Sequence, residues 1–164
     1  MKKLPPKAEE VSAQRKDTPG GPIAIGWKEY VDFPEWRLKH VKAKIDTGAR
    51  TSALDVLAYE LHEDAAGGTI AELHLSLDRK NPERRTIIQV PVLRMVAVCN
   101  SGGVREYRPL IEVNIRLGQV TKRVQLTVAN RSGMLFRMIL GRRALDGDFL
   151  VDVSKKYLLR KKST

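Results

Sequence analysis

Short runs in which apolar and polar residues alternate occupy most of the chain after residue 22, and they constrain its fold more than any other feature. A period of two is typical of a strand with one buried face. The runs cover residues 27–33, 41–45, 59–62, 70–77, 86–90, 92–98, 110–117 and 121–128. Gly67-Gly68 predicts a hairpin between the third and fourth runs. The spacing predicts an all-β domain, a small barrel or sandwich, with one short helix at 142–145.

The length and the charge distribution predict one folded domain between two polar ends. A chain of 164 residues is long enough for a single domain with its own core. Residues 1–21 lack apolar periodicity and are predicted to form a disordered tail, and residues 22–153 are predicted to fold. Residues 154–164 form a basic C-terminal tail with five basic residues and no acidic one. Although the net charge is +11, such a tail usually aids solubility, so nucleic acid is not an expected partner.

Cysteine content and hydropathy predict a cytoplasmic protein with no membrane partner. Cys99 is the single cysteine, which rules out an internal disulfide and suits a reducing compartment. We expect it to be a half-buried structural thiol. No apolar stretch approaches the roughly 20 residues of a membrane span. The N-terminus has no apolar segment typical of a secretory signal.

Asp46-Thr47-Gly48-Ala49 follows the strand-like run 41–45 and is the strongest candidate for chemistry. Gly48 allows a tight turn beside the carboxylate, and Thr47 can hydrogen-bond within the corner. Acid–base catalysis by aspartates can use two carboxylates that share one proton. Because the motif occurs once, the second aspartate is expected from another copy of the chain, which predicts a homodimer.

Two longer strings extend this motif into a family resemblance. Residues 45–54 read Ile-Asp-Thr-Gly-Ala-Arg-Thr-Ser-Ala-Leu, and residues 138–145 read Met-Ile-Leu-Gly-Arg-Arg-Ala-Leu. In this order they resemble the retropepsin-like aspartic proteases. Together with Ile-Gly-Trp-Lys-Glu-Tyr at 25–30 and Phe-Leu-Val-Asp at 149–152, they resemble a bacterial subgroup usually labelled ATP-dependent zinc protease. The resemblance implies a closed acid-protease β-barrel and a homodimeric endopeptidase with Asp46, Thr47 and Gly48 in its catalytic loop.

The resemblance also implies substrate-binding residues. The Asn100-Ser-Gly-Gly103 turn resembles a protease flap, a hairpin that closes over the substrate, with Gly102 and Gly103 at its tip and Arg105 beside it. Ala49 and Arg50 directly follow the catalytic loop. Retroviral enzymes commonly carry an acidic residue at the position of Arg50, and it pairs with the arginine that corresponds here to Arg142. We therefore expect Arg142 to have another partner, with Asp55 and Asp152 as candidates.

Arginines near these motifs predict an acidic substrate. If even two of them face the groove, the cleft is positively charged and concentrates anionic peptides. The five candidates are Arg50, Arg105, Arg108, Arg142 and Arg143. This predicts an acidic or glutamylated protein substrate. The alternative is that these arginines are surface charges paired with Glu106, Asp146 and Asp148.

The sequence predicts no metal site and no cofactor. It contains no His-Glu-x-x-His pair and no Cys/His cluster at metal-binding spacing, so the zinc and ATP in the subgroup's label find no support in its residues. His62 and His74 are expected to be ordinary surface histidines. The alternative to a peptidase is a non-catalytic basic β-barrel module that binds RNA, a ribosomal protein or another polyanion. In that case Asp-Thr-Gly is a structural corner.

Overall fold

The computed structural model describes residues 20–76, 81, 83–99, 102–130 and 135–160, and these residues form an all-β fold. The strands are β1 (Ile23–Ile25), β2 (Lys28–Phe33), β3 (Leu38–Ile45), β4 (Ser52–Asp55), β5 (Ala58–Glu63), β6 (Thr69–Leu75), β7 (Thr86–Cys99), β8 (Arg105–Leu117), β9 (Val120–Ala129), β10 (Met138–Leu140) and β11 (Phe149–Val151). The helical segments are a 3₁₀ turn, η1 (Pro34–Trp36), and the predicted helix α1 (Arg142–Leu145). The predicted fold class is confirmed. Within the described residues, no helix is long and apolar enough to cross a membrane.

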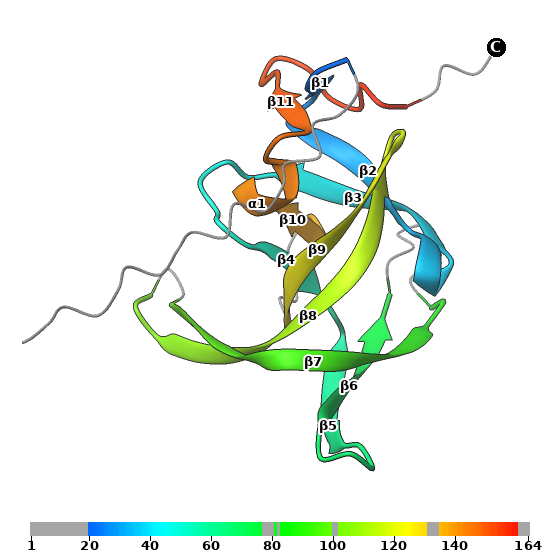
Figure 1. The fold of residues 1–164 in the computed structure, drawn as a ribbon, viewed down its shortest axis with the longest axis vertical. Helices are drawn as coiled ribbons and strands as arrows, with labels where there is room; N and C mark the ends of the chain where they lie inside the picture. Colours follow the sequence, from blue (N-terminus) through cyan, green and yellow to red (C-terminus); the bar gives the residue numbers. More distant parts are fainter. Residues whose placement is uncertain (1–19, 77–80, 82, 100–101, 131–134, 161–164) are drawn as a thin grey trace, which may run out of the picture.

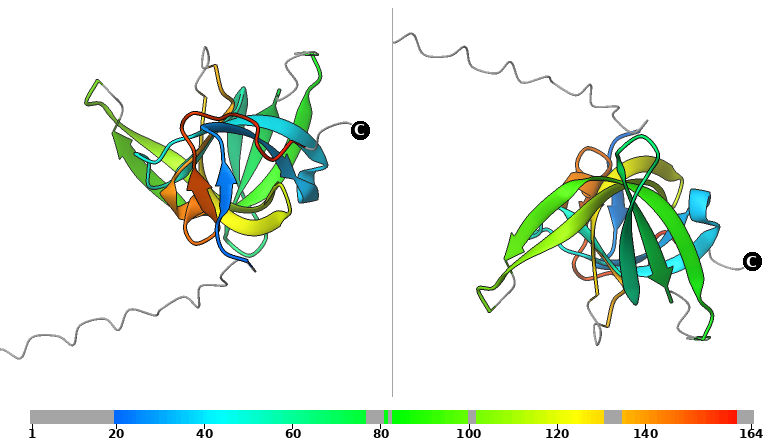
Figure 2. Two further views of the ribbon diagram at one scale, coloured as in Figure 1. Left: turned by 90° about the horizontal axis from the view of Figure 1, so that it is seen from above. Right: turned by 90° about the horizontal axis from the view of Figure 1, so that it is seen from below.

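Six strands close into a barrel (Figure 1). Their order is β2-β3-β10-β4-β9-β8, and a contact between Asp32 on β2 and Arg116 on β8 closes the ring. β7, β6 and β5 continue the sheet beyond β8, and β1 pairs with β11 in a separate two-stranded sheet. The long β7–β8 hairpin extends away from the barrel as an arm (Figure 2).

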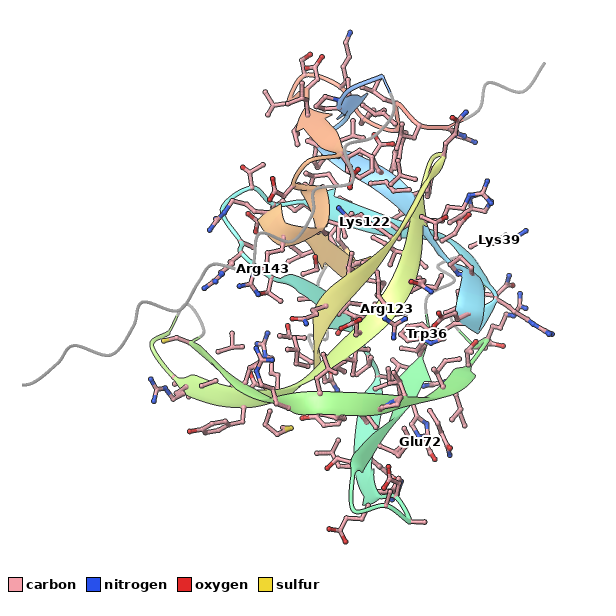
Figure 3. The ribbon with its side chains drawn as sticks, in the orientation of Figure 1. Trp36, Lys39, Glu72, Lys122, Arg123 and Arg143 are labelled. Atoms are coloured by element: carbon pink, nitrogen blue, oxygen red, sulfur yellow. The ribbon has the colours of Figure 1, made fainter. Side chains whose placement is uncertain are left out.

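Alternation along the strands fills the barrel with apolar side chains. On β2, Val31 and Phe33 are buried, whereas the alternating residues Tyr30 and Asp32 are partly exposed. β8 alternates in the same way over its second half. Fully burying one such aliphatic or aromatic side chain contributes about 2 kcal/mol. Arg123, labelled in Figure 3, is exposed on β9 and forms ion pairs with Glu112 and with Glu35 in η1.

β7 is one continuous strand, where the sequence pattern predicts two runs separated at Pro91. Residues up to Pro91 pair with β6, and residues from Val92 onward pair with β8. The proline therefore lies where the strand exchanges one neighbour for the other, a position that tolerates a missing N–H donor. The predicted Gly67-Gly68 hairpin is present between β5 and β6.

The segment 154–160, which the sequence pattern sets apart as part of a basic tail, packs against β2. The buried carboxylate of Glu29 accepts hydrogen bonds from the backbone N–H groups of Gly26, Leu158 and Leu159. Tyr157 stacks on Tyr30 with ring centroids 4.4 Å apart. These contacts hold the segment on the domain. Residues 1–19 and 161–164 lie outside the described residues.

Candidate active site

Asp46 stands at the end of β3, and its carboxylate is held by its own loop. Oδ1 accepts hydrogen bonds from the backbone N–H of Gly48 at 3.0 Å and of Ala49 at 3.2 Å. The Asp46 N–H donates to the carbonyl of Leu140 on β10 at 2.9 Å, which anchors the loop to the barrel. Asp46 is half-buried, whereas Thr47 and Gly48 are exposed. The predicted catalytic residues therefore form one rigid corner whose carboxylate remains accessible.

The start of α1 fixes this loop through its carbonyl groups. The Arg142 guanidinium donates to the carbonyls of Thr47 at 3.1 Å and Gly48 at 3.0 Å. The backbone N–H of Arg142 donates to Ala49, and that of Arg143 donates to Arg50. Four successive loop carbonyls are thus bound by two residues of α1. We call this set of bonds the loop clamp.

The expectation that Arg142 pairs with Asp55 or Asp152 is wrong. Asp55 is buried and forms an ion pair with Arg137, with Nη1 and Oδ2 2.7 Å apart. Asp152 accepts hydrogen bonds from the hydroxyl and the backbone N–H of Ser154, and these hold the pKa of its carboxyl below the ordinary value. Both carboxylates bind other donors, and the Arg142 guanidinium binds backbone oxygens.

Replacing Arg142 with alanine is expected to weaken catalysis through the loop. The variant loses both guanidinium bonds of the loop clamp, and we expect a stability loss of about 2 kcal/mol together with a lower kcat at nearly unchanged KM. Urea unfolding and peptide hydrolysis measure the two effects. Arg142→Lys, which can reach one carbonyl, should recover part of the kcat; a variant with unaltered kcat would contradict the positioning role.

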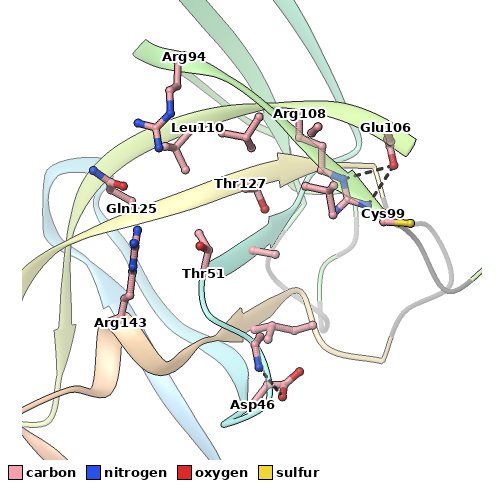
Figure 4. A pocket seen from close by; sticks show the side chains of 16 residues that line it. Asp46, Thr51, Arg94, Cys99, Glu106, Arg108, Leu110, Gln125, Thr127 and Arg143 are labelled. Atoms are coloured by element: carbon pink, nitrogen blue, oxygen red, sulfur yellow. Dashed lines mark hydrogen bonds and ion pairs between the residues drawn. The ribbon is translucent and has the colours of Figure 1, made fainter. Parts of the chain in front are cut away.

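A cleft of about 730 Å³ separates the Asp46 loop from the β7–β8 arm (Figure 4). Its lining comes from the loop, from the arm and from the barrel strands between them. The lining residues are Asp46, Ala49, Thr51, Ala53, Arg94, Val96, Ala97, Val98, Cys99, Glu106, Arg108, Leu110, Gln125, Thr127, Ile139 and Arg143. The structure thus places the predicted flap arm across a cleft from the predicted catalytic residue.

Paired residues on the two strands of the arm line the cleft. Arg94, Val96 and Val98 on β7 lie opposite Leu110, Arg108 and Glu106 on β8, and all six line the cleft. Ala97 and Cys99 on β7 line the cleft as well, whereas Arg105 and Tyr107, their partners on β8, do not. The expected substrate-binding residue Arg105 is therefore outside the cleft lining.

Three arginines line the cleft, and two of them have no acidic partner within the part of the chain that the structure describes. Arg108 pairs with Glu106, with Nη2 and Oε2 3.0 Å apart. Among the described residues, Arg94 and Arg143 form no ion pair. In Figure 4 both side chains extend toward Gln125. Sequence reasoning named Arg108 and Arg143 but missed Arg94, which stands inside an otherwise apolar run.

The remaining predicted binding residues lie around the cleft. Ala49 is part of the lining, but Arg50 is exposed outside it, as are Gly102 and Gly103 at the tip of the arm. Gly103 has a φ of +79°, a left-handed conformation that favours glycine. Asn100 and Ser101 of the predicted turn lie outside the described residues. Cys99 is exposed on the arm, so the expectation of a half-buried thiol is wrong.

The described residues do not fit a zinc site. They contain no group of three or more His, Cys, Asp or Glu side chains that could hold a metal ion. His62 and His74 each lie beside a glutamate of the same strand, with N–O distances of 3.6 Å to Glu60 and 3.0 Å to Glu72. They are not paired with each other in the β5–β6 register.

Comparison with known families identifies this architecture. A sequence profile of the RimB-like family, described as retropepsin-like aspartic endopeptidase RimB, matches residues 24–162. The chain belongs to this family. The match contains the Asp46 loop, the arm and the loop clamp. It also contains the 154–160 segment that packs on β2.

Curated relatives of this RimB-like chain carry a different name and are much longer. It is 36% identical over 132 residues to a probable alpha-L-glutamate ligase of Parasynechococcus marenigrum, and 33% identical over 130 residues to one of Desulfotalea psychrophila. These alignments cover 79% and 78% of the chain but only 28% and 27% of the ligases. A crystal structure of a Legionella pneumophila protein of unknown function has the same fold, with a TM-score of 0.69 and 21% identity. That match covers 84% of this chain and 98% of the other.

Proposed function

We propose that this chain is an aspartic-type endopeptidase that acts as a homodimer and cleaves acidic proteins. The observation that carries the proposal is the Asp46 carboxylate, held by two backbone N–H groups in a clamped loop and facing a cleft beneath a hairpin arm. A group fixed in this way is pre-organised for acid–base chemistry. Membership of a retropepsin-like family supports the same reaction.

The chemistry requires a second copy of the chain, because one loop supplies one carboxylate. In the proposed dimer the two Asp46 side chains flank a water molecule and share one proton. The ionised carboxylate takes a proton from the water as its oxygen attacks the scissile carbonyl carbon. The protonated carboxylate gives its proton to the carbonyl oxygen. Proton transfer to the amide nitrogen then accompanies cleavage of the C–N bond.

The charge of the cleft supports an acidic substrate. Arg94 and Arg143 line it without ion-pair partners among the described residues, and an arginine fork binds a carboxylate through two parallel hydrogen bonds. A glutamate ligase joins glutamate to an acceptor, so the names of the longer relatives point to a carboxylate-rich product. We infer that glutamate side chains near the cleaved bond bind these two arginines.

Peptide cleavage tests the substrate class. Arg94→Gln and Arg143→Gln are each expected to lower kcat/KM for a glutamate-rich peptide by about tenfold. Cleavage of a neutral peptide should change little, and raising the salt concentration should reduce the preference for glutamate. The measurement is a fluorogenic peptide series at low and high ionic strength.

Arg85→Gln is the matched control, because it removes the same charge from an exposed position outside the cleft lining. It should leave the preference for glutamate unchanged. Equal cleavage of acidic and neutral peptides by the unmodified protein would reject the acidic substrate without rejecting the peptidase. Absence of cleavage of any peptide would instead favour the non-catalytic module.

A further inference from the structure

The outer face of β2 and β3 carries lysines that have no ion-pair partner among the described residues. Lys28 on β2 lies directly opposite Lys44 on β3, and Lys42 lies opposite Tyr30. Like charges in directly opposed positions destabilise a sheet. Binding of an anion relieves this repulsion, so the pair favours an anionic ligand. Lys39 at the start of β3 adds an exposed cation to the same hairpin (Figure 3).

The C-terminal segment brings two further lysines to this hairpin. The backbone N–H of Trp27 donates to the carbonyl of Lys155 at 2.9 Å, and the backbone N–H of Tyr157 donates to the carbonyl of Lys28 at 2.9 Å. Lys155 and Lys156 between these bonds are exposed. The acidic groups nearby already have donors, since Asp32 accepts the N–H of His40 and Asp152 binds Ser154. The basic residues that are separated in the sequence therefore gather beside one strand pair.

Three aromatic rings lie among these lysines. Tyr30 stacks on Tyr157, and His40 meets Tyr30 edge-on with ring centroids 5.8 Å apart. His40 and Tyr157 both have left-handed backbones, with φ of 58° and 52°, which is unusual for bulky side chains. The Lys28 ammonium lies 5.3 Å from the centre of the Tyr157 ring. The three rings are partly or fully exposed and lie beside cationic side chains.

We propose that this lysine–aromatic face, formed by Lys28, Tyr30, His40, Lys42, Lys44 and residues 155–157, binds single-stranded RNA. Lysine ammonium groups suit phosphates as point charges, and aromatic rings stack on unpaired bases. A carboxylate-rich protein would be better matched by arginine forks. RNA is favoured over DNA because its loops present unpaired bases, whereas duplex DNA keeps them stacked inside. The distribution of charge along the sequence does not favour nucleic acid as a partner. We base the proposal on the way the structure brings these lysines and rings together on one face.

Fluorescence anisotropy with a labelled RNA of about 12 nucleotides and mixed sequence tests the proposal. The Lys42→Gln/Lys156→Gln variant is expected to bind about tenfold more weakly at low salt, with the slope of log K against log salt reduced by about 1.4. Tyr157→Leu should weaken binding with little change in that slope, because stacking releases no counterions. The Arg84→Gln/Arg85→Gln variant loses the same charge elsewhere and should bind as the unmodified chain does.

Further outcomes distinguish RNA binding at this face from the reaction at the proposed active site. Asp46→Asn protein should bind the RNA with unchanged affinity, whatever happens to peptide cleavage. Absence of RNA binding, or equal weakening by the two double variants, would overturn the proposal. Tighter binding of an RNA duplex or of single-stranded DNA of the same length would also overturn it. So would a labelled polyglutamate peptide that binds more tightly than the RNA and depends on Lys42 and Lys156, because it would assign the face to acidic proteins.

Discussion

Replacement of Asp46 by asparagine is expected to lower the rate of peptide hydrolysis by at least about 10³-fold while the fold remains intact. An amide cannot take a proton from water, so the proposed attack on the scissile bond loses its base. The side-chain oxygen of asparagine can still accept the N–H groups of Gly48 and Ala49, which keeps the loop in place. Hydrolysis of a glutamate-rich fluorogenic peptide measures the rate, and thermal unfolding checks the fold.

Asp146→Asn provides the control for this substitution. Asp146 is exposed at the end of α1 and outside the cleft lining, so losing its charge should leave hydrolysis unchanged. Full activity in the Asp46→Asn protein would remove Asp46 from the reaction. That result would favour the alternative function, a non-catalytic binding module.

Gly141→Ala is expected to destabilise the protein by about 3 kcal/mol and to lower activity at the same time. A Cβ at this position would lie 2.8 Å from the carbonyl carbon of Thr51 and 2.9 Å from the carbonyl oxygen of Ala49. These are backbone atoms, and Ser52 Oγ accepts the Gly141 N–H at 3.0 Å, so neither side can withdraw without breaking bonds. The glycine is what allows α1 to approach the Asp46 loop. Urea unfolding measures the loss.

Gly67→Ala separates this clash from the ordinary cost of replacing glycine. Gly67 has a φ of +82° at the exposed β5–β6 turn, and a Cβ there meets no atom within 4 Å. Its replacement should cost about 1 kcal/mol through backbone strain alone. Equal losses in the two variants would show that close approach at Gly141 does not govern the loop.

Long runs of alternating residues predicted most of the barrel strands. The shortest strands could not be predicted from the sequence. β2, β8 and β9 are long enough to show a period of two. β10 has three residues, Met138–Leu140, between β3 and β4, so its sequence shows an apolar run without a measurable period. The continuity of β7 through Pro91 depends on an exchange of neighbours, which is a property of the tertiary structure.

The position of the Asp46 loop beside a cleft was predictable from its motif, whereas the charges around the cleft depended on the tertiary structure. Asp46 and the arm stand across one cleft as the order of the motifs implied. Arg105 was expected at the substrate, but it is not among the residues that line the cleft. Arg94, which lies opposite Leu110 on the arm, lines the cleft instead. The loop clamp could not be predicted from the sequence, because its acceptors are backbone carbonyls and every residue type has one.

Subunit mixing tests most directly whether two copies of Asp46 form one active site. Unmodified and Asp46→Asn chains are mixed at several ratios, allowed to exchange subunits, and assayed at constant total concentration. If each site needs both carboxylates, activity falls with the square of the unmodified fraction, to about one quarter in an equal mixture. A linear fall to about one half would contradict a shared site, because it would mean that each chain hydrolyses peptides with its own Asp46 alone.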